Sequence, residues 1–205
     1  LLFVVFCLLF VKKEKENFLE VFPFKKVSVI DILIAVCLFL GLFFGLGQLN
    51  VAFSEVLIKI GVNVSEIDVS VNSFWGYLLN VLVLSVAPAV GEEILFRGVV
   101  LFCLASYSSG KGENKDKLII SLINGVLFSL FHKNLAQLLY QFVYGFILSY
   151  MTLKTKNILI AVLMHFLNNF IILTQAAFFP YVNLYNTVTL IIGLILLVAG
   201  LFLML

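Results

Sequence analysis

The sequence predicts an all-α membrane protein, a single transmembrane domain over residues 1–205 that crosses the bilayer about seven or eight times. Of the 205 residues, 63% are hydrophobic and 12% are charged, whereas soluble domains average about 45–50% apolar and about 25% charged residues. The apolar residues occur in long runs, while a transmembrane barrel would show short segments of alternating hydrophobicity. These observations indicate a polytopic helical protein.

Seven segments are apolar enough to be expected as spans, because a helix needs roughly 20 apolar residues to cross about 30 Å of hydrocarbon. The first segment is short and has no initial Met, so we expect it to be the end of a longer helix. The third contains Pro88 and Gly91 and forms one long helix or two short ones. The expected spans are residues 1–11, 29–49, 74–105, 118–132, 135–153, 157–175 and 186–205.

Lysines predict the orientation, because short cytoplasmic loops contain an excess of Lys and Arg. Ten of the twelve lysines fall on one side of a seven-span chain, in the segments 12–28, 106–117 and 154–156. We therefore expect these loops in the cytoplasm of a multi-pass cell-membrane protein, with the third segment as one long helix. The net charge of +2 is too small to indicate a nucleic-acid partner.

A few ionisable side chains interrupt the apolar spans, and these are the candidate functional residues. A charge at the bilayer centre costs at least ~2.5–3.5 kcal/mol on insertion scales, so such groups are functional candidates by default. The segment GEEILFRG contains Glu92, Glu93 and Arg97, and the only histidines are His132 and His165.

Helical spacing gives the two adjacent carboxylates different surroundings. Glu93 and Arg97 are four residues apart with the acid first, the favoured order for a helical ion pair. Glu92 lies about 100° around the helix from Glu93. Arg97 can therefore neutralise Glu93 while Glu92 remains available as a general base. In the same way, Phe128 and His132 share one face of their helix.

The segment HFLNN places two amides near the second histidine. Asn168 and Asn169 follow His165 at i+3 and i+4, and either can share its face. Counted from the lysine-rich ends, Glu92, His132 and His165 lie about 20, 21 and 12 Å deep at ~1.5 Å per residue. Tilted helices can bring these depths together in one cavity. We expect the cavity to open toward the cytoplasm, since His165 is nearer to that side.

These residue types suit hydrolysis. A Glu–His pair can hold and deprotonate water, and a His N–H with an Asn amide can donate to the developing oxyanion. No Ser or Cys nucleophile is required, and Ser129 lacks an oriented base. A catalytic zinc ion is the alternative, held by Glu92, His132 and His165 with one open position. One histidine could then not serve the oxyanion.

Three blocks, in this order, resemble the CPBP family of intramembrane proteases, also called the CAAX-protease, bacteriocin-processing or Abi family. The family pattern is Glu-Glu-x-x-x-Arg, then Phe-x-x-x-His, then His-x-x-x-Asn. In this chain the blocks are EEILFR from Glu92, FSLFH from Phe128 and HFLNN from His165. The resemblance covers about residues 74–175.

The resemblance implies an intramembrane endopeptidase in which residues 74–175 form the catalytic core of a helical bundle with a conical or central cavity. The family is often described as metalloproteases, which leaves zinc as a possible cofactor. The residues carried over are Glu92 and His132 for water activation, His165 and Asn169 for the oxyanion, and Glu93, Arg97, Phe128 and Asn168 in support.

The expected partners are the lipid bilayer and a peptide or protein substrate at the membrane. In eukaryotes the resemblance implies prenylated CAAX motifs, and in bacteria it implies bacteriocin or signal-peptide processing or self-immunity. The frequent Phe, Ile, Asn and Lys residues favour a prokaryotic cell membrane. Two alternatives stay open: a non-catalytic membrane protein that binds a peptide, and a transporter that relays protons through Glu and His.

Overall fold

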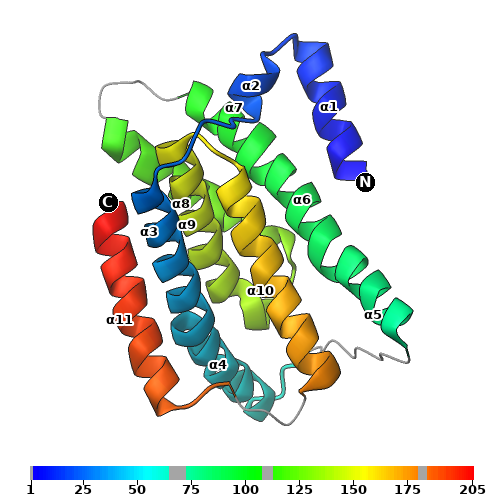
Figure 1. Cartoon of the computed structure of the whole chain (residues 1–205), viewed down its shortest axis with the longest axis vertical. Helices are drawn as coiled ribbons and strands as arrows, with labels where there is room; N and C mark the ends of the chain where they lie inside the picture. The colour runs from blue at the N-terminus through cyan, green and yellow to red at the C-terminus, as the bar shows by residue number, and fades with distance from the viewer. Residues whose placement is uncertain (1, 65–72, 108–112, 180–183) are drawn as a thin grey trace.

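The described part of the chain is helical, as predicted. The computed structural model describes residues 2–64, 73–107, 113–179 and 184–205. Within these ranges no β-strand occurs, and Phe24 and Asn157 form an isolated antiparallel bridge. Figure 1 shows the long helices packed side by side in a bundle. This arrangement confirms the predicted all-α class.

The helices are joined by short connections, and some contain a wider π-type turn, here η1 to η3, while η4 is a single 3-10 turn. In chain order the elements are α1 (Leu2–Glu14), α2 (Phe18–Val21), α3 (Val29–Leu40), η1 (Gly41–Leu46), α4 (Gly47–Lys59), α5 (Phe74–Asn80), η2 (Val81–Val86), α6 (Ala87–Glu93), η3 (Ile94–Val100), α7 (Leu101–Ser106), α8 (Glu113–Phe131), η4 (Leu135–Gln137), α9 (Leu138–Thr155), α10 (Leu159–Phe178) and α11 (Thr187–Met204).

Four continuous helices are long and apolar enough to cross a membrane, among the residues described. They are Val29–Lys59, Phe74–Ser106, Leu159–Phe178 and Thr187–Met204. Each corresponds to a predicted span, although the first continues to Lys59, past the predicted end at residue 49. The other three predicted spans are helical but do not meet this standard. They are α1, with 13 residues, and α8 and α9, with 19 and 18 residues.

The third predicted segment is one continuous helix of 33 residues, as the lysine distribution predicts. Pro88 lies inside it and lacks the N–H that a helix interior requires. It follows the wide turn η2, where the N–H of Ala87 donates to the carbonyl of Leu82, five residues earlier. Wide turns of this kind accommodate a displaced hydrogen bond. The helix therefore passes Pro88 without a break and continues into the two glutamates.

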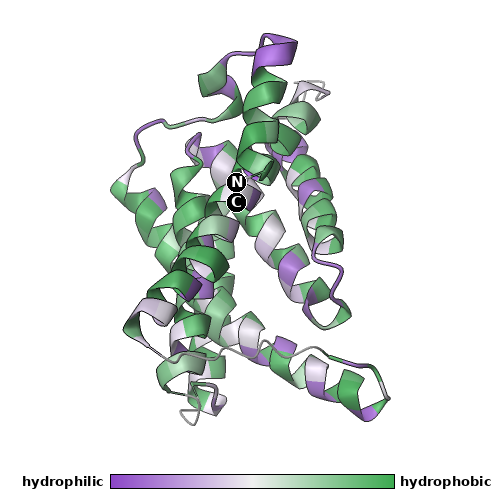
Figure 2. Cartoon of the chain, turned by 90° about the vertical axis from the view of Figure 1, so that its right-hand side faces the viewer, coloured by the Kyte–Doolittle hydropathy of each residue, from purple (hydrophilic) through white to green (hydrophobic). Residues whose placement is uncertain are grey.

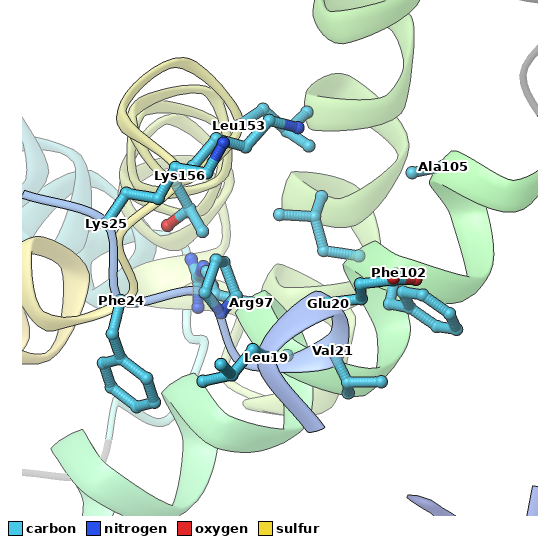
Figure 3. A pocket seen from close by; sticks show the side chains of 14 residues that line it. Leu19, Glu20, Val21, Phe24, Lys25, Arg97, Phe102, Ala105, Leu153 and Lys156 are labelled. Atoms are coloured by element: carbon cyan, nitrogen blue, oxygen red, sulfur yellow. The ribbon is translucent and has the colours of Figure 1, made fainter. Parts of the chain in front are cut away.

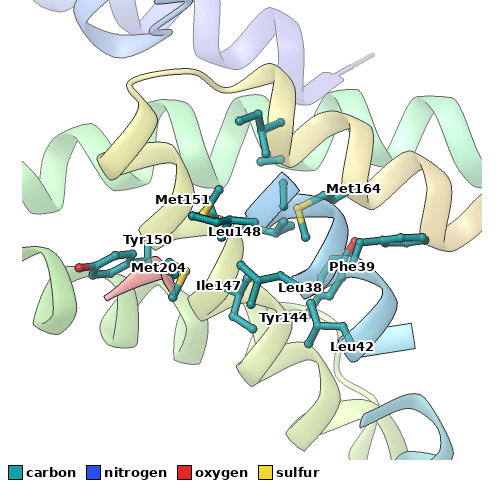
Figure 4. Packing of buried hydrophobic residues seen from close by; sticks show 14 of the residues in the cluster. Leu38, Phe39, Leu42, Tyr144, Ile147, Leu148, Tyr150, Met151, Met164 and Met204 are labelled. Carbon is teal, nitrogen blue, oxygen red and sulfur yellow. The ribbon is translucent and has the colours of Figure 1, made fainter. Parts of the chain in front are cut away.

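The central helix is α9, which packs against α3, α4, α8 and α10. Its residues Tyr144, Ile147, Leu148 and Met151 are buried. Figure 4 shows them beside Leu38 of α3 in the main apolar cluster. Because lipid tails are as apolar as these side chains, their packing stabilises the bundle through van der Waals contact between the helices. This cluster fixes α9 between α3 and α10, and so sets the positions of the helices around the candidate site.

Glycines allow α11 to approach η1 closely. A Cβ added at Gly41 would lie 2.5 Å from the backbone nitrogen of Leu197, and one added at Gly193 would overlap the backbone of Gly45. Small residues at such crossings let two membrane helices pack backbone against backbone. The C-terminal helix is therefore held against η1 by van der Waals contact that any larger side chain would prevent.

Hydrogen bonds join two lysine-rich segments at one end of the bundle. The N–H of Lys25, between α2 and α3, donates to the carbonyl of Lys156 at 2.9 Å. The side-chain amide of Asn157 donates to the carbonyl of Lys25 at 2.6 Å. Lys154 Nζ donates to the last carbonyls of α11. The turn between α9 and α10 and the C-terminus therefore meet at this end (Figure 1).

The opposite end of the bundle contains the C-terminus of α4, with Lys59, and the turn after α8, with Lys133 (Figure 1). Lys111, in the third lysine-rich segment, lies outside the described residues. Figure 2 shows hydrophobic residues along the helices and many hydrophilic ones at their ends and connections. The separation of lysines that the sequence predicts is thus present for the described segments.

We expect Gly193→Ala to destabilise the protein by about 1–3 kcal/mol, because the added methyl group overpacks the crossing with η1. The measurement is the thermal unfolding midpoint in detergent. The control is Gly91→Ala, since a Cβ there meets only Phe3, at 3.6 Å. Equal midpoints for the two variants would contradict the close approach of α11.

Candidate active site

Three helices bring the predicted site residues together. The α6–η3 segment contributes the two glutamates and Arg97, the end of α8 contributes Phe128 and His132, and α10 contributes His165 and the two asparagines. A cavity of about 440 Å³ lies between α4, α6, α9 and α10, within the size range of pockets that bind small ligands. The predicted residues that line it are Glu92, His132, His165, Asn168 and Asn169.

Glu92 and His132 face each other across the cavity. His132 Nε2 lies 3.7 Å from Glu92 Oε2, which is longer than a direct hydrogen bond. His132 Nδ1 lies 2.9 Å from the carbonyl oxygen of Phe128. Because a carbonyl only accepts, Nδ1 bears the proton and Nε2 of the neutral ring is an acceptor. Both groups can therefore bond to one water molecule held between them.

Glu93 and Arg97 form the predicted ion pair, and both side chains are fully buried. Arg97 Nη1 donates to Glu93 Oε1 at 2.9 Å. Arg97 Nη2 donates to the carbonyl of Gly145 at 3.2 Å, and the guanidinium carbon lies 4.2 Å from the centre of the Phe128 ring. The charge of Glu93 is therefore balanced inside the bundle, where an unpaired carboxylate would be costly.

The same Glu93 oxygen also binds the second histidine. His165 Nδ1 donates to Glu93 Oε1 at 2.7 Å, a contact across 72 positions of sequence that the motif spacing does not reveal. The hydrogen bond to the carboxylate fixes the orientation of the imidazole ring and keeps the proton on Nδ1. His165 lines the cavity, so Nε2 remains as the nitrogen for the reaction.

Hydrogen bonds on α10 distinguish the two asparagines. The hydroxyl of Tyr140, on α9, donates to Asn168 Oδ1 at 2.7 Å. Asn168 Nδ2 in turn donates to Asn169 Oδ1 at 3.2 Å. Asn168 is therefore engaged on both sides, while Asn169 keeps its NH₂ group for the cavity. The sequence motifs do not identify Tyr140, and the available signal is its i,i+4 spacing from Tyr144, which places both rings on one face of α9.

The Phe128 ring lies behind the cavity and packs against His132, His165 and Arg97. The ring packs edge-on to His132 and His165, with centroids 4.6 and 6.0 Å away, and lies under Arg97. Gly145 makes room for it, because a Cβ there would lie 3.0 Å from the ring. Because Gly145 has no side chain, the Phe128 ring can pack against it and Arg97 can reach its carbonyl oxygen.

The geometry does not match the zinc site that the sequence allows. Among the residues that the structure describes, no three His, Cys, Asp or Glu side chains are grouped so as to hold a metal ion. None of the described residues lining the cavity is Ser, Thr or Cys, and Ser129 donates to the carbonyl of Leu138 instead. The arrangement fits activation of water by Glu and His.

The cavity lies on the lysine-poor side of the site, so the expectation that it opens toward the lysine-rich side is wrong. Its outer walls include Asn50 of α4, Gln137 of η4, Gln175 of α10 and Tyr185, all near the lysine-poor end. Counting depth along α10 alone missed these walls, since they come from other helices. Burial raises the pKa of the Tyr185 hydroxyl above its usual range, so it stays protonated at neutral pH.

A comparison with known protein families gives a match over the helices that carry the candidate site. The family model described as type II CAAX prenyl endopeptidase Rce1-like matches residues 74–171. Over these residues the chain is similar to the Rce1-like CAAX protease family. The matched range is slightly less than half of the chain, and it contains all eight predicted site residues. No curated protein and no solved structure matches the chain.

This similarity supports an intramembrane endopeptidase, a class that acts on a peptide or protein at the membrane. The matched segment begins with the helix Phe74–Ser106 and ends within α10. The helices before it and α11 after it lie outside the match, although α4 and Tyr185 contribute to the cavity wall. The matched range therefore contains the candidate site residues, and helices outside it complete the cavity wall.

We expect Arg97→Gln to destabilise the fold by about 3–5 kcal/mol, because it leaves Glu93 buried without its partner charge. The double variant Glu93→Gln/Arg97→Gln removes both charges and should regain much of that stability. Thermal unfolding in detergent measures both effects. An Arg97→Gln protein as stable as wild type would show that the ion pair does not support the fold.

Proposed function

We propose that this membrane protease cleaves peptide bonds by glutamate-activated water, with Glu92 as the general base. The observation that supports this assignment is that the two adjacent carboxylates have different surroundings. Glu93 is fully buried, does not line the cavity and is bonded through Oε1 to Arg97 and His165, whereas Glu92 lines the cavity and its Oε2 lies 3.7 Å from His132 Nε2. Of the two carboxylates, Glu92 is therefore the one that can bind a water molecule in the cavity.

Hydrolysis begins with a water molecule held between Glu92 and His132. Glu92 removes one proton as the water oxygen attacks the scissile carbonyl carbon, and His132 Nε2 accepts the second O–H and orients the water. The hydrogen bond from His132 to the Phe128 carbonyl keeps the ring in this orientation. Glu92 then gives its proton to the leaving amine as the C–N bond breaks. General base and acid steps of this kind accelerate reactions by roughly 10²–10⁴-fold.

The oxyanion that forms on the carbonyl oxygen is stabilised by Asn169 and His165. Asn169 offers its NH₂ group, which Asn168 orients through the bond to its oxygen. His165 donates from Nε2 when the ring is protonated, and Glu93 stabilises that cation through Nδ1. Donors fixed before the reaction are typically worth about 10²–10³-fold each in rate.

The cavity walls fit a peptide substrate. Apolar side chains such as Phe43, Leu84 and Ile172 alternate with the amides of Asn50 and Gln141. Apolar surface binds hydrophobic side chains, while amides can pair with a peptide backbone. This mixture favours an extended segment of a membrane-associated peptide, in the classes implied for the family: CAAX-type, bacteriocin or signal peptides.

The proposed orientation of the protein in the membrane favours some of these substrate classes over others. We propose that the lysine-rich end faces the cytoplasm of a prokaryotic cell, as the positive-inside rule predicts. The cavity then opens on the other face of the membrane, because its outer walls lie near the lysine-poor end. A substrate on that face is an exported peptide, so bacteriocin or signal-peptide processing is favoured over cleavage of cytoplasmic CAAX motifs.

Glu92→Gln should abolish peptide cleavage, with a fall of at least about 10²-fold, because the amide keeps the shape of the side chain but removes the base. The measurement is peptide release in detergent from a panel of prenylated and unprenylated membrane peptides. Glu55→Gln is the matched control, since Glu55 is exposed on α4. Activity that survives Glu92→Gln but not Glu93→Gln would contradict the assignment.

The same assay separates the alternatives. Cleavage by wild type that persists with a chelator supports the metal-independent reaction, whereas loss with the chelator indicates the zinc-dependent hydrolase. No cleavage of any peptide by wild type, together with peptide binding that survives Glu92→Gln, indicates the non-catalytic binding protein.

Cysteine labelling tests the orientation. In a background with Cys7, Cys37 and Cys103 changed to Ala, we expect Ala176→Cys, which lines the cavity, to react with a membrane-impermeant maleimide in intact cells. Ala105→Cys, which lies near the lysine-rich end, should react only after permeabilisation. The reverse pattern would place the cavity on the cytoplasmic face and restore the CAAX-type substrates.

A further inference from the structure

A second pocket, of about 500 Å³, lies at the lysine-rich end and is separate from the active cavity. The short helix α2 and the segment after it form one wall, and α7 and the end of α9 form the others. No part of the proposed reaction uses this pocket. Arg97 is the only site residue that lines it.

Two lysines at this pocket are held in place by their backbones. The N–H of Lys25 donates to the carbonyl of Lys156, and Asn157 binds the carbonyl of Lys25 and also caps α10 through the N–H of Leu159. Lys156 ends α9 in the left-handed conformation, with φ 52°. These backbone contacts place the side chains of Lys25 and Lys156, which are far apart in the sequence, at one pocket before any ligand binds.

The pocket has a basic side and an apolar side. Figure 3 shows Lys25, Lys156 and Arg97 on one side and Phe102 and Ala105 on the other. Glu20, the pocket's acidic side chain, lies beside Phe102, away from the lysines (Figure 3). A ligand that fits must therefore have an anionic group at one end and an apolar part at the other.

Arg97 connects this pocket to the active site. Two of its guanidinium nitrogens bind Glu93 and the Gly145 carbonyl. Its third nitrogen, Nε, is buried and has no hydrogen-bond partner within the described part of the chain. An unpaired buried donor on a cation is costly unless an acceptor reaches it. This is a second observation, independent of the lysines, that indicates an anionic ligand.

We infer that this pocket binds the phosphate-bearing head group of an anionic phospholipid, with the start of an acyl chain against Leu101 and Phe102. The pocket lies where lysine-rich segments meet the ends of the apolar helices, which is the position expected of a membrane surface. Basic pockets between membrane helices on the cytoplasmic side bind such head groups, and each Lys or Arg near the surface contributes about 1 kcal/mol. A bound lipid would support Arg97 from the side opposite Glu93.

The test is lipid binding to the purified full chain in neutral detergent, followed by native mass spectrometry. The probes are phosphatidylglycerol, zwitterionic phosphatidylcholine and inorganic phosphate. Wild type should bind one phosphatidylglycerol and prefer it to phosphatidylcholine. Lys25→Gln/Lys156→Gln removes two charges and should weaken binding about 30-fold. Lys12→Gln/Lys13→Gln removes two exposed charges of α1 outside the pocket and should leave binding unchanged.

Ala105→Trp is the second variant, because it fills the apolar side without changing charge, and it should also weaken phosphatidylglycerol binding. The thermal unfolding midpoint of each variant is measured as well. A midpoint equal to that of wild type shows that a loss of binding does not come from loss of the fold. If the pocket variant Lys25→Gln/Lys156→Gln and the α1 variant Lys12→Gln/Lys13→Gln lost phosphatidylglycerol binding equally, binding would depend on general surface charge. That result would contradict the proposed site. Competition by inorganic phosphate as strong as by the lipid would overturn the lipid assignment. Cleavage activity is not needed for either result.

Discussion

The buried ion pair between Glu93 and Arg97 is the interaction on which the rest of the site depends. Each charge would be costly alone in the apolar interior, and together they form a fixed centre. From it, one bond extends to His165 on α10 and another to the Gly145 carbonyl on α9. The Phe128 ring of α8 packs beneath the guanidinium. A single pair thus joins the four helices that surround the site.

This arrangement explains why two adjacent glutamates are useful. Residues that follow each other on a helix point about 100° apart, so the side chains of Glu92 and Glu93 lie in different surroundings. Glu93 faces the packed interior and is bonded through Oε1 to Arg97 and His165, while Glu92 faces the cavity opposite His132. The neutralised interior keeps the helix in position, and the proposed base stays free to exchange a proton with water.

The two pockets lie on opposite sides of this centre. The active cavity extends toward the lysine-poor end and contains the reacting groups, whereas the lysine-rich pocket reaches Arg97 from the other side. A substrate and a lipid head group would therefore approach one ion pair from opposite faces of the membrane. The bilayer would then supply part of the electrostatic environment of the site.

The sequence by itself determined the membrane class, the long helix through Pro88 and the i,i+4 pair of Glu93 and Arg97, because apolar runs and helical spacing are local properties. It also identified five of the residues that line the cavity, namely Glu92, His132, His165, Asn168 and Asn169. Only the tertiary structure decided that Glu93 binds His165, that Tyr140 engages Asn168, and that the cavity lies toward the lysine-poor end. These features depend on contacts between helices far apart in the chain, whose tilt and rotation are set by packing around α9.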